Sequence, residues 1–299
     1  MASITAEGIK TLREKTGVSL SACKRALEEA SGNEMKAIEI LRKKGEAKAV
    51  ERGQRATGEG IIASYVHSNS KIGVLVQLGC ETDFVARTKD FQELARAIAK
   101  LAASNFHASA ESLLKEKLPG SSESVESALK EKIGKLGENM LLKRVVQFGS
   151  EGSLVGNYIH SPYDGALDCG RLGVLIEVKT DLGVSVAGPL LKELSMQIAA
   201  TSPRWIKKED VPPEWVEKER AIYLEQCKGM GKPEVAWPKI IEGKFKDFYK
   251  QFCLLEQNHV RDSGGKTSVL SFLDSSSKQL GSTLSISNMA RFKAGEELT

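Results

Sequence analysis

The stretch GVLVQLGCETDFVAR, residues 73–87, contains the pattern that decides the fold class. Its first half is an apolar run rich in β-branched residues and bounded by glycine, which is typical of a buried strand. Thr82, Asp83 and the aromatic Phe84 follow almost at once. A phenylalanine at such a turn either folds back into the core or is offered to another molecule. On residue type alone, the core is the more frequent outcome.

The same pattern occurs a second time, one hundred positions later. GVLIEV (173–178) matches GVLVQL (73–78), and Thr180-Asp181 repeats Thr82-Asp83. Two more pairs agree in the same order: EGIIASYVHS (59–68) with EGSLVGNYIHS (151–161), and QELARAIA (92–99) with KELSMQIA (192–199). Each copy predicts a strand, a loop, an apolar strand, a turn and an amphipathic helix. The predicted fold class is therefore α+β, with two core subdomains related by duplication.

Helical segments flank and interrupt these two copies. Three short helices are predicted between residues 4 and 52, the third ending at Lys43-Lys44-Gly45, and EAKAVERGQRATGEG (46–60) is expected to be a partly helical linker. A long helical hairpin is predicted at about 205–250, with its turn at Gly229–Pro233. The expected domains are residues 1–55, a helical bundle with its linker; 56–148, the first core subdomain; and 149–299, the second with the hairpin.

Composition narrows the function classes. The formal net charge is +4 and aromatic residues make up 6% of the chain. The sequence therefore lacks the basic stripe with interleaved aromatics that is typical of nucleic-acid binding. The five cysteines form no CxxC pair, which predicts reduced thiols, no metal site and a reducing compartment. No apolar run approaches the roughly 20 residues that span a bilayer. We expect a cytoplasmic protein, or a mitochondrial or plastid one whose transit peptide has been removed.

Two glycine motifs look like nucleotide sites and fail on inspection. GEGIIA (58–63) fits the loose dinucleotide pattern, but it follows a linker and opens a predicted strand rather than a helix. SGGKTS (263–268) looks like a phosphate loop, but the first glycine that this loop requires is replaced by Val260. No catalytic constellation stands out. We therefore predict neither an enzyme nor a bound cofactor.

Several blocks of this sequence, in order, resemble one family. TGVSLSACKRALEEASGNEMKAIEILRKKG (16–45) is similar to the N-terminal ubiquitin-associated-like module of elongation factor Ts, the exchange factor of elongation factor Tu. CETDFVAR resembles the most recognisable core motif of that family. Further blocks with the same resemblance are KLGENMLLKRV (135–145), the YIH of the second repeat, GVLIEV and IEGKFKDF (241–248). The resemblance extends over essentially the whole chain.

The resemblance implies a mechanism and a set of partner-binding residues. The bundle would dock on the GTPase domain of elongation factor Tu, and the Thr-Asp-Phe turn would insert beside the magnesium and phosphate site, so that GDP leaves. By match to the family motifs, the contributing residues would be Thr82, Asp83, Phe84, Leu136, Gly137, His160, Lys24 and Leu20. The partners expected are elongation factor Tu, GDP-bound or nucleotide-free, and a second copy of the chain through the hairpin, but neither nucleic acid nor membrane.

Alternatives and departures from the family stay open at this point. A histidine at a strand end, such as His160, is more often structural, and His67 occupies the same place in the first repeat. By residue type alone, Lys24 would be a solvated lysine and Leu136-Gly137 a simple helix junction. The segment SPYDGALDCGRLG after His160 is longer than in many members, and Leu20-Ser21 replaces two adjacent methionines that are common there. A second function class is an interaction module whose bundle binds ubiquitin-like or nascent-chain partners. That class gives Asp83 and Phe84 no role.

Overall fold

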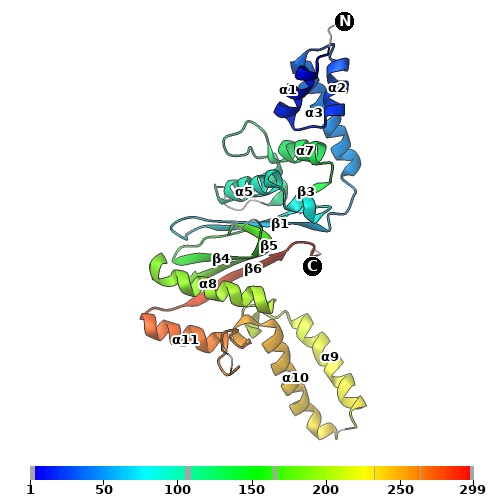
Figure 1. Ribbon diagram of the computed structural model, residues 1–299. Coiled ribbons are helices and arrows are strands. Elements are labelled where there is room, and N and C mark those ends of the chain that lie inside the picture. Colours follow the sequence, from blue (N-terminus) through cyan, green and yellow to red (C-terminus); the bar gives the residue numbers. More distant parts are fainter. Residues whose placement is uncertain (1–3, 105–108, 164–166, 232, 263, 297–299) are drawn as a thin grey trace.

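An N-terminal three-helix bundle forms one end of the molecule (Figure 1). The computed structural model describes residues 4–104, 109–163, 167–231, 233–262 and 264–296. The bundle consists of α1 (Ala6–Thr16), α2 (Leu20–Glu29) and α3 (Glu34–Arg52). Thr5 caps α1, and Gly17 ends it in the left-handed conformation that glycine adopts without strain. The apolar faces of the three helices meet around Leu12, Cys23 and Leu27, so the predicted bundle is confirmed.

The third helix is longer than the sequence indicates. The prediction that it ends at Lys43-Lys44-Gly45 is wrong, because α3 continues to Arg52 through most of the expected linker. Its second half packs on α7 (Val125–Leu136) of the core. At the crossing, a Cβ added to Gly134 would lie 3.0 Å from the Cα of Gly45, so glycine on both helices permits the close approach. Arg52 then donates to the carbonyl of Ile133. Tertiary contacts therefore outweigh the local tendency of Gly45 to end the helix.

One curled antiparallel sheet forms the centre. Its strands are β1 (Glu59–Val66), β2 (Gly73–Cys80), β3 (Met140–Phe148), β4 (Ser153–Pro162), β5 (Cys169–Lys179) and β6 (Ser285–Lys293). The order is β3-β2-β1-β5-β4, and β6 also pairs with β5. The two halves join through a short pairing of Ile62 and Ala63 with the start of β5. The α+β class is confirmed.

The two halves of the sheet pack against each other and carry helices on their outer sides. Helices α5 (Lys89–Ser104) and α7 cover β1–β3, whereas α8 (Val184–Thr201) and α11 (Val269–Leu280) cover β4–β6 (Figure 1). The apolar layer between the halves is formed by Ile62, Leu75, Val155, Ile159, Leu175 and Phe292. This arrangement buries β2 on both faces, as its continuous apolar sequence predicts.

The duplication is visible in details of the backbone. Bulges fall between Gln77 and Leu78 in the first half and between Glu177 and Val178 in the second, one hundred positions apart. Gly73 and Gly173 likewise make equivalent close approaches. A side chain at Gly73 would meet Val155 and Leu175, and a side chain at Gly173 would meet Ile62 and Leu75. The structure also extends the repeat, because each half ends with a helix and a third strand, α7–β3 or α11–β6, that the sequence analysis did not assign.

The remaining helices are insertions. The first copy carries α6 (Ala110–Lys115), and the second carries the hairpin of α9 (Pro213–Gly229) and α10 (Trp237–Phe252). The hairpin lies at the end of the molecule opposite the bundle (Figure 1) and closes on an aromatic cluster around Phe245. Three single 3₁₀ turns complete the assignment: η1 (Lys208–Asp210), η2 (Glu234–Ala236) and η3 (Leu254–Glu256). The domain boundaries after residues 55 and 148 stay predictions. Among the described helices, none combines the length and apolar content that a bilayer crossing requires.

Candidate functional site

The residues that follow β2 form a short turn that presents one aromatic side chain to solvent. Thr82 caps the four-residue helix α4 (Asp83–Ala86), in which Val85 and Ala86 are buried in the first core. Phe84 points the other way and is 80% exposed. The expectation from residue type, that Phe84 is a core residue, is therefore wrong. We call residues 81–87 the Asp-Phe turn.

A second turn holds the Asp-Phe turn in place. The Thr82 backbone N–H and hydroxyl both donate to the Glu138 carboxylate, at 3.0 and 2.6 Å. In the opposite direction, the Asn139 backbone N–H donates to Glu81 at 2.7 Å. Gly137 ends α7 with a φ of 85°, which turns the chain so that Glu138 faces Thr82. The structure thus brings Leu136-Gly137 and Thr82-Asp83-Phe84 together. Sequence analysis missed Glu138, since nothing local links it to a threonine far back in the chain.

The second repeat builds a similar turn-to-turn contact, but its apolar residue is partly buried. Thr180 Oγ1 lies 3.2 Å from Ser282 Oγ, and Ser282 also donates to Asp181. Ser282 directly follows Gly281, which ends α11 in the left-handed conformation as Gly137 ends α7. Leu182, the counterpart of Phe84, packs against the second core. The turn therefore belongs to both copies, and the exposed aromatic belongs to one.

The thiol beneath the Asp-Phe turn is inert. Cys80 is buried and donates to the carbonyl of Thr82 at 3.1 Å. Burial, reinforced by the negative charge of Glu138, raises the pKa of this thiol to about 12. The nucleophilic thiolate is thus absent near neutral pH. All five cysteines are buried, and none forms a disulfide.

His160 lies on β4, and a residue that follows it, Tyr163, contacts the Asp-Phe turn. It is exposed on β4, opposite Leu172, and its Nδ1 lies 3.1 Å from the Tyr158 hydroxyl. Strand β4 continues to Pro162, and Tyr163 is then buried with the Arg87 guanidinium 5.2 Å from its ring centroid. Part of the long segment after His160 lies outside the described residues. His67 and Tyr65 of the first repeat also lie ring against ring, edge-on rather than tilted, so the Tyr-x-His pair has a structural component.

The two bundle residues lie apart from the turn. Leu20 is 48% exposed at the start of α2, and Lys24 is exposed one turn later, with Glu28 at 3.9 Å. Lys135 of α7 links the bundle to the core, because its side chain lies against Gly17 while its Nζ donates to Asp90 at 2.6 Å. This hydrogen bond holds the pKa of Asp90 below its usual range.

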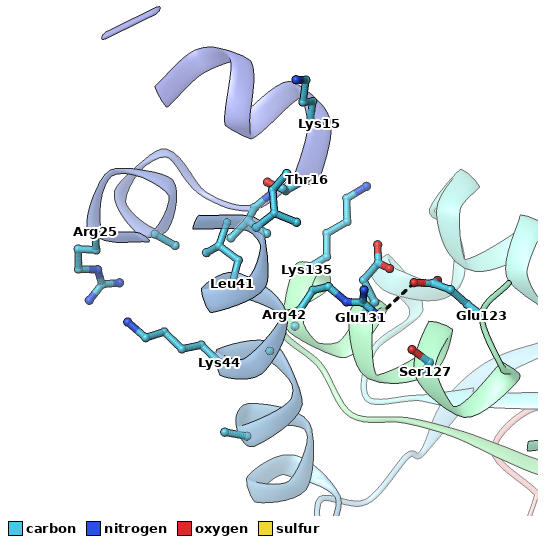
Figure 2. A pocket seen from close by; sticks show the side chains of 16 residues that line it. Lys15, Thr16, Arg25, Leu41, Arg42, Lys44, Glu123, Ser127, Glu131 and Lys135 are labelled. Carbon is cyan, nitrogen blue, oxygen red and sulfur yellow. Dashed lines mark hydrogen bonds and ion pairs between the residues drawn. The ribbon is translucent and has the colours of Figure 1, made fainter. Parts of the chain in front are cut away.

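A groove of about 660 Å³ lies between the bundle and α7 (Figure 2). Leu41 and Arg42 of α3 lie on one side of it and Glu131 and Lys135 of α7 on the other, and Arg42 reaches Glu123 at 3.5 Å. The Asp-Phe turn does not line this groove. Phe84 is thus exposed at a place separate from this groove.

The described residues give no support to a nucleotide or metal site in the chain itself. GEGIIA opens β1 rather than a helix. In the phosphate-loop-like segment, the backbone N–H groups of Gly264, Lys266 and Thr267 all donate to the Asp262 carboxylate. These bonds, that from Thr267 first, lower the pKa of Asp262 to about 2, so an internal carboxylate already occupies the position of a phosphate. Within the described ranges, no group of three or more acidic, histidine or cysteine residues could hold a metal ion.

Comparison with known proteins gives a consistent result. A family model described as Elongation factor TS matches residues 81–296. A protein named Elongation factor Ts from Clostridium botulinum (strain Eklund 17B / Type B) is 40% identical over 293 residues, covering 98% of this chain and 93% of its own. Another of the same name from Prosthecochloris aestuarii is 39% identical over 297 residues, covering 99% of this chain and all of its own.

Proposed function

Since the chain belongs to the elongation factor Ts family, we propose that it binds elongation factor Tu and releases GDP by inserting the Asp-Phe turn beside the magnesium and phosphate site. One observation carries the role of the turn: Phe84 is 80% exposed on a short helix whose next two residues, Val85 and Ala86, are buried. A phenylalanine exposed to this extent contributes little to its own core, and burying its ring in a partner would supply apolar binding energy.

In this mechanism the turn acts as a wedge. The Phe84 ring enters between two helices of the GTPase domain, and their displacement disturbs the phosphate loop and the magnesium ligands. Asp83 stands at the same tip, with its Oδ2 3.3 Å from Arg87 Nε. Because Glu138 holds Thr82, the wedge is already shaped before the partner arrives. A wedge ordered in advance loses less conformational entropy on binding.

Thermodynamic linkage sets what the contacts must supply. If the factor lowers the affinity of elongation factor Tu for GDP, then GDP must lower the affinity of elongation factor Tu for the factor by the same ratio. Loosening GDP by about two to three decades requires roughly 3–4 kcal/mol of differential binding. Burying one phenylalanine supplies about 1.5–3 kcal/mol. The remainder falls to the other positions proposed to touch elongation factor Tu: Leu136, Gly137, His160, Leu20 and Lys24.

Exchange of this kind makes and breaks no covalent bond, so we infer a non-enzymatic factor without a cofactor of its own. A bundle that only captured ubiquitin-like or nascent-chain partners would leave the Asp-Phe turn without a purpose, and we therefore prefer exchange. The bacterial relatives favour the cytoplasm of a bacterium over a mitochondrion or plastid.

We also propose self-association through the hairpin. Trp215 and Ile222, 37% and 41% exposed, lie two turns apart on α9 and so share one face. A second copy that covers this face would bury both side chains. Ile222→Glu should convert a dimer to a monomer in light scattering, and Ile222→Ala serves as the milder control. A wild-type protein that is monomeric at every accessible concentration would exclude the dimer.

The exchange proposal is tested with a fluorescent GDP bound to bacterial elongation factor Tu and chased with excess unlabelled GDP. Substoichiometric amounts of this protein should accelerate release, because one molecule serves many turnovers. Release at the spontaneous rate, with complex formation absent as well, would overturn the proposal. Complex formation without acceleration would instead favour the interaction-module alternative.

A further inference from the structure

The residues that follow His160 belong to the second repeat but pack on the Asp-Phe turn of the first. Tyr163 is 4% exposed, and the Arg87 guanidinium lies over its ring at 5.2 Å from the centroid. A few residues later, Asp168 accepts from Arg96 Nε of α5 with both oxygens, at 3.0 and 2.9 Å. Two contacts thus join the start of β5 and the end of β4 to the helices α4 and α5.

We infer that Tyr163 and Asp168 are positioning residues for nucleotide exchange, which fix the Asp-Phe turn from the opposite half of the molecule. This inference rests on the proposed function. It assigns a role to two described residues between β4 and β5. Neither residue needs to touch elongation factor Tu.

From Asp168 the path to the turn is continuous. Arg96, held by Asp168, donates from Nη2 to Gln92 Oε1 at 3.3 Å. The Gln92 amide in turn donates to the carbonyl of Arg87, the residue that ends α4, at 3.1 Å. Gln92 is buried, so its amide has little freedom to reorient. The Arg96 guanidinium thus contacts both residues at once, Asp168 through Nε and Gln92 through Nη2.

From Tyr163 the path is shorter. Arg87 lies over the ring and places its Nε 3.3 Å from Asp83 Oδ2, directly beside Phe84. The Tyr163 hydroxyl is buried without a hydrogen-bond partner among the described residues. The contribution of Tyr163 is therefore the face of its ring rather than its hydroxyl.

Helix α4 depends on tertiary contacts: Val85 and Ala86 are buried in the first core, and the contacts of Thr82 and Arg87 hold its two ends. A helix of four residues is far below the length at which a helix is stable alone. Phe84 is also exposed, so its own packing adds nothing to the order of the turn. Thr82 and Arg87 flank α4, so their contacts keep the helix in place when the Phe84 ring is inserted into the partner. Glu138 holds the first of these, and Tyr163 with Gln92 holds the second.

The test compares Tyr163→Leu with Tyr163→Phe, each made in the wild-type chain and in a Phe84→Ala chain. We expect Y163L to slow GDP release within the complex by about threefold to tenfold, the range of one partly desolvated cation–π contact. Y163F keeps the ring and should match wild type. In the F84A background, Y163L should add nothing, because no wedge is left to position. A merely structural role would slow both backgrounds equally and would overturn the inference.

A second variant keeps the inference testable if Y163L folds poorly, as judged by circular dichroism and thermal unfolding. Asp168→Asn keeps the shape of the side chain and the backbone carbonyl, which still accepts from the Ser64 N–H at 2.8 Å. We expect D168N to slow release in the wild-type chain but not in the F84A chain. If the wild-type protein is active and the Y163L and D168N variants release GDP at the same rate, the positioning role of Tyr163 and Asp168 is overturned and the proposed function stands. Inactive wild-type protein would remove both.

Discussion

Thr82 and Glu138, far apart in the sequence, form the tightest link at the candidate site: the carboxylate accepts the Thr82 hydroxyl at 2.6 Å and the Thr82 backbone N–H at 3.0 Å. The equivalent link in the second repeat, between Thr180 and Ser282, joins two hydroxyl groups. In the first copy the threonine is thus held directly by a carboxylate, whereas in the second it is held by a hydroxyl that itself donates to the Asp181 carboxylate.

Removing this link should affect exchange more than stability. We expect Glu138→Gln to lower the free energy of unfolding by about 1–2 kcal/mol, since the two hydrogen bonds from Thr82 lose their charged acceptor. It should also slow GDP release, because the turn loses its fixed position. Thr180→Val is the matched control: it should destabilise the fold by about 1 kcal/mol and leave release unchanged. Equal effects of the two variants on release would contradict the role of Glu138.

Phe84 should contribute almost nothing to the stability of the free protein. Its side chain is 80% exposed, so Phe84→Ala is expected to change the free energy of unfolding by less than about 0.5 kcal/mol. Leu182→Ala, at the equivalent position, should cost about 1–3 kcal/mol because Leu182 packs on the second core. Urea unfolding of both variants makes the comparison. A strongly destabilised F84A variant would show that the ring is part of the fold.

The crossing of α3 and α7 should not tolerate a side chain. A Cβ at Gly134 would lie 3.0 Å from the Gly45 backbone, whereas a Cβ at Gly243 in α10 would meet nothing within 4 Å. Gly243→Ala should gain up to about 1 kcal/mol of helix propensity. Gly134→Ala should be at least about 1 kcal/mol less stable than that control, because the helices must separate. Similar gains in both variants would mean that the bundle moves freely on the core.

A buried carboxylate should make the fold sensitive to acid. Glu177 is 1% exposed; burial alone would raise its pKa, but hydrogen bonds from Asn288 and Ser150 outweigh this and hold the pKa below its usual range. Its stabilisation is thus present above the ordinary pKa of about 4.3 and is lost as the pH falls through the lowered value.

Glu177→Gln tests this sign, because the first repeat has Gln77 at the equivalent position. The variant should be about 1–3 kcal/mol less stable than wild type at pH 7. The difference should shrink as the pH falls below about 4. A difference that stays constant between pH 7 and pH 3 would show that the charge of Glu177 is not the cause.

The sequence predicts the parts of the fold that rest on local pattern. The two strands and the following helix of each copy carry clear apolar periodicity, and the repetition of Gly73 at Gly173 ties them together. Sequence analysis did not predict strands β3 and β6, because both mix polar and charged residues with apolar ones and are only partly buried along most of their length. Their strand conformation comes from pairing with β2 and β5, which no local pattern reveals.

Residues of the site divide in the same way. Thr82, Asp83 and Phe84 are consecutive in one motif, so the sequence alone predicts that they lie close together. Glu138 and Tyr163 join the turn only through tertiary structure, and neither carries a signal in its own segment. The repeat itself shows that Leu182 replaces Phe84 in the second copy. That Phe84 is exposed whereas Leu182 is partly buried could be learned only from the structure.

The central claim is that the Phe84 ring drives GDP release, and single-turnover stopped flow tests it most directly. Fluorescent GDP bound to elongation factor Tu is mixed with saturating wild-type, F84A or L182A protein, and the limiting release rate is measured. We predict wild-type and L182A rates that agree, and an F84A rate at least about tenfold lower, corresponding to the 1.5–3 kcal/mol of one buried phenylalanine. An F84A rate equal to that of wild type at saturation would contradict the account.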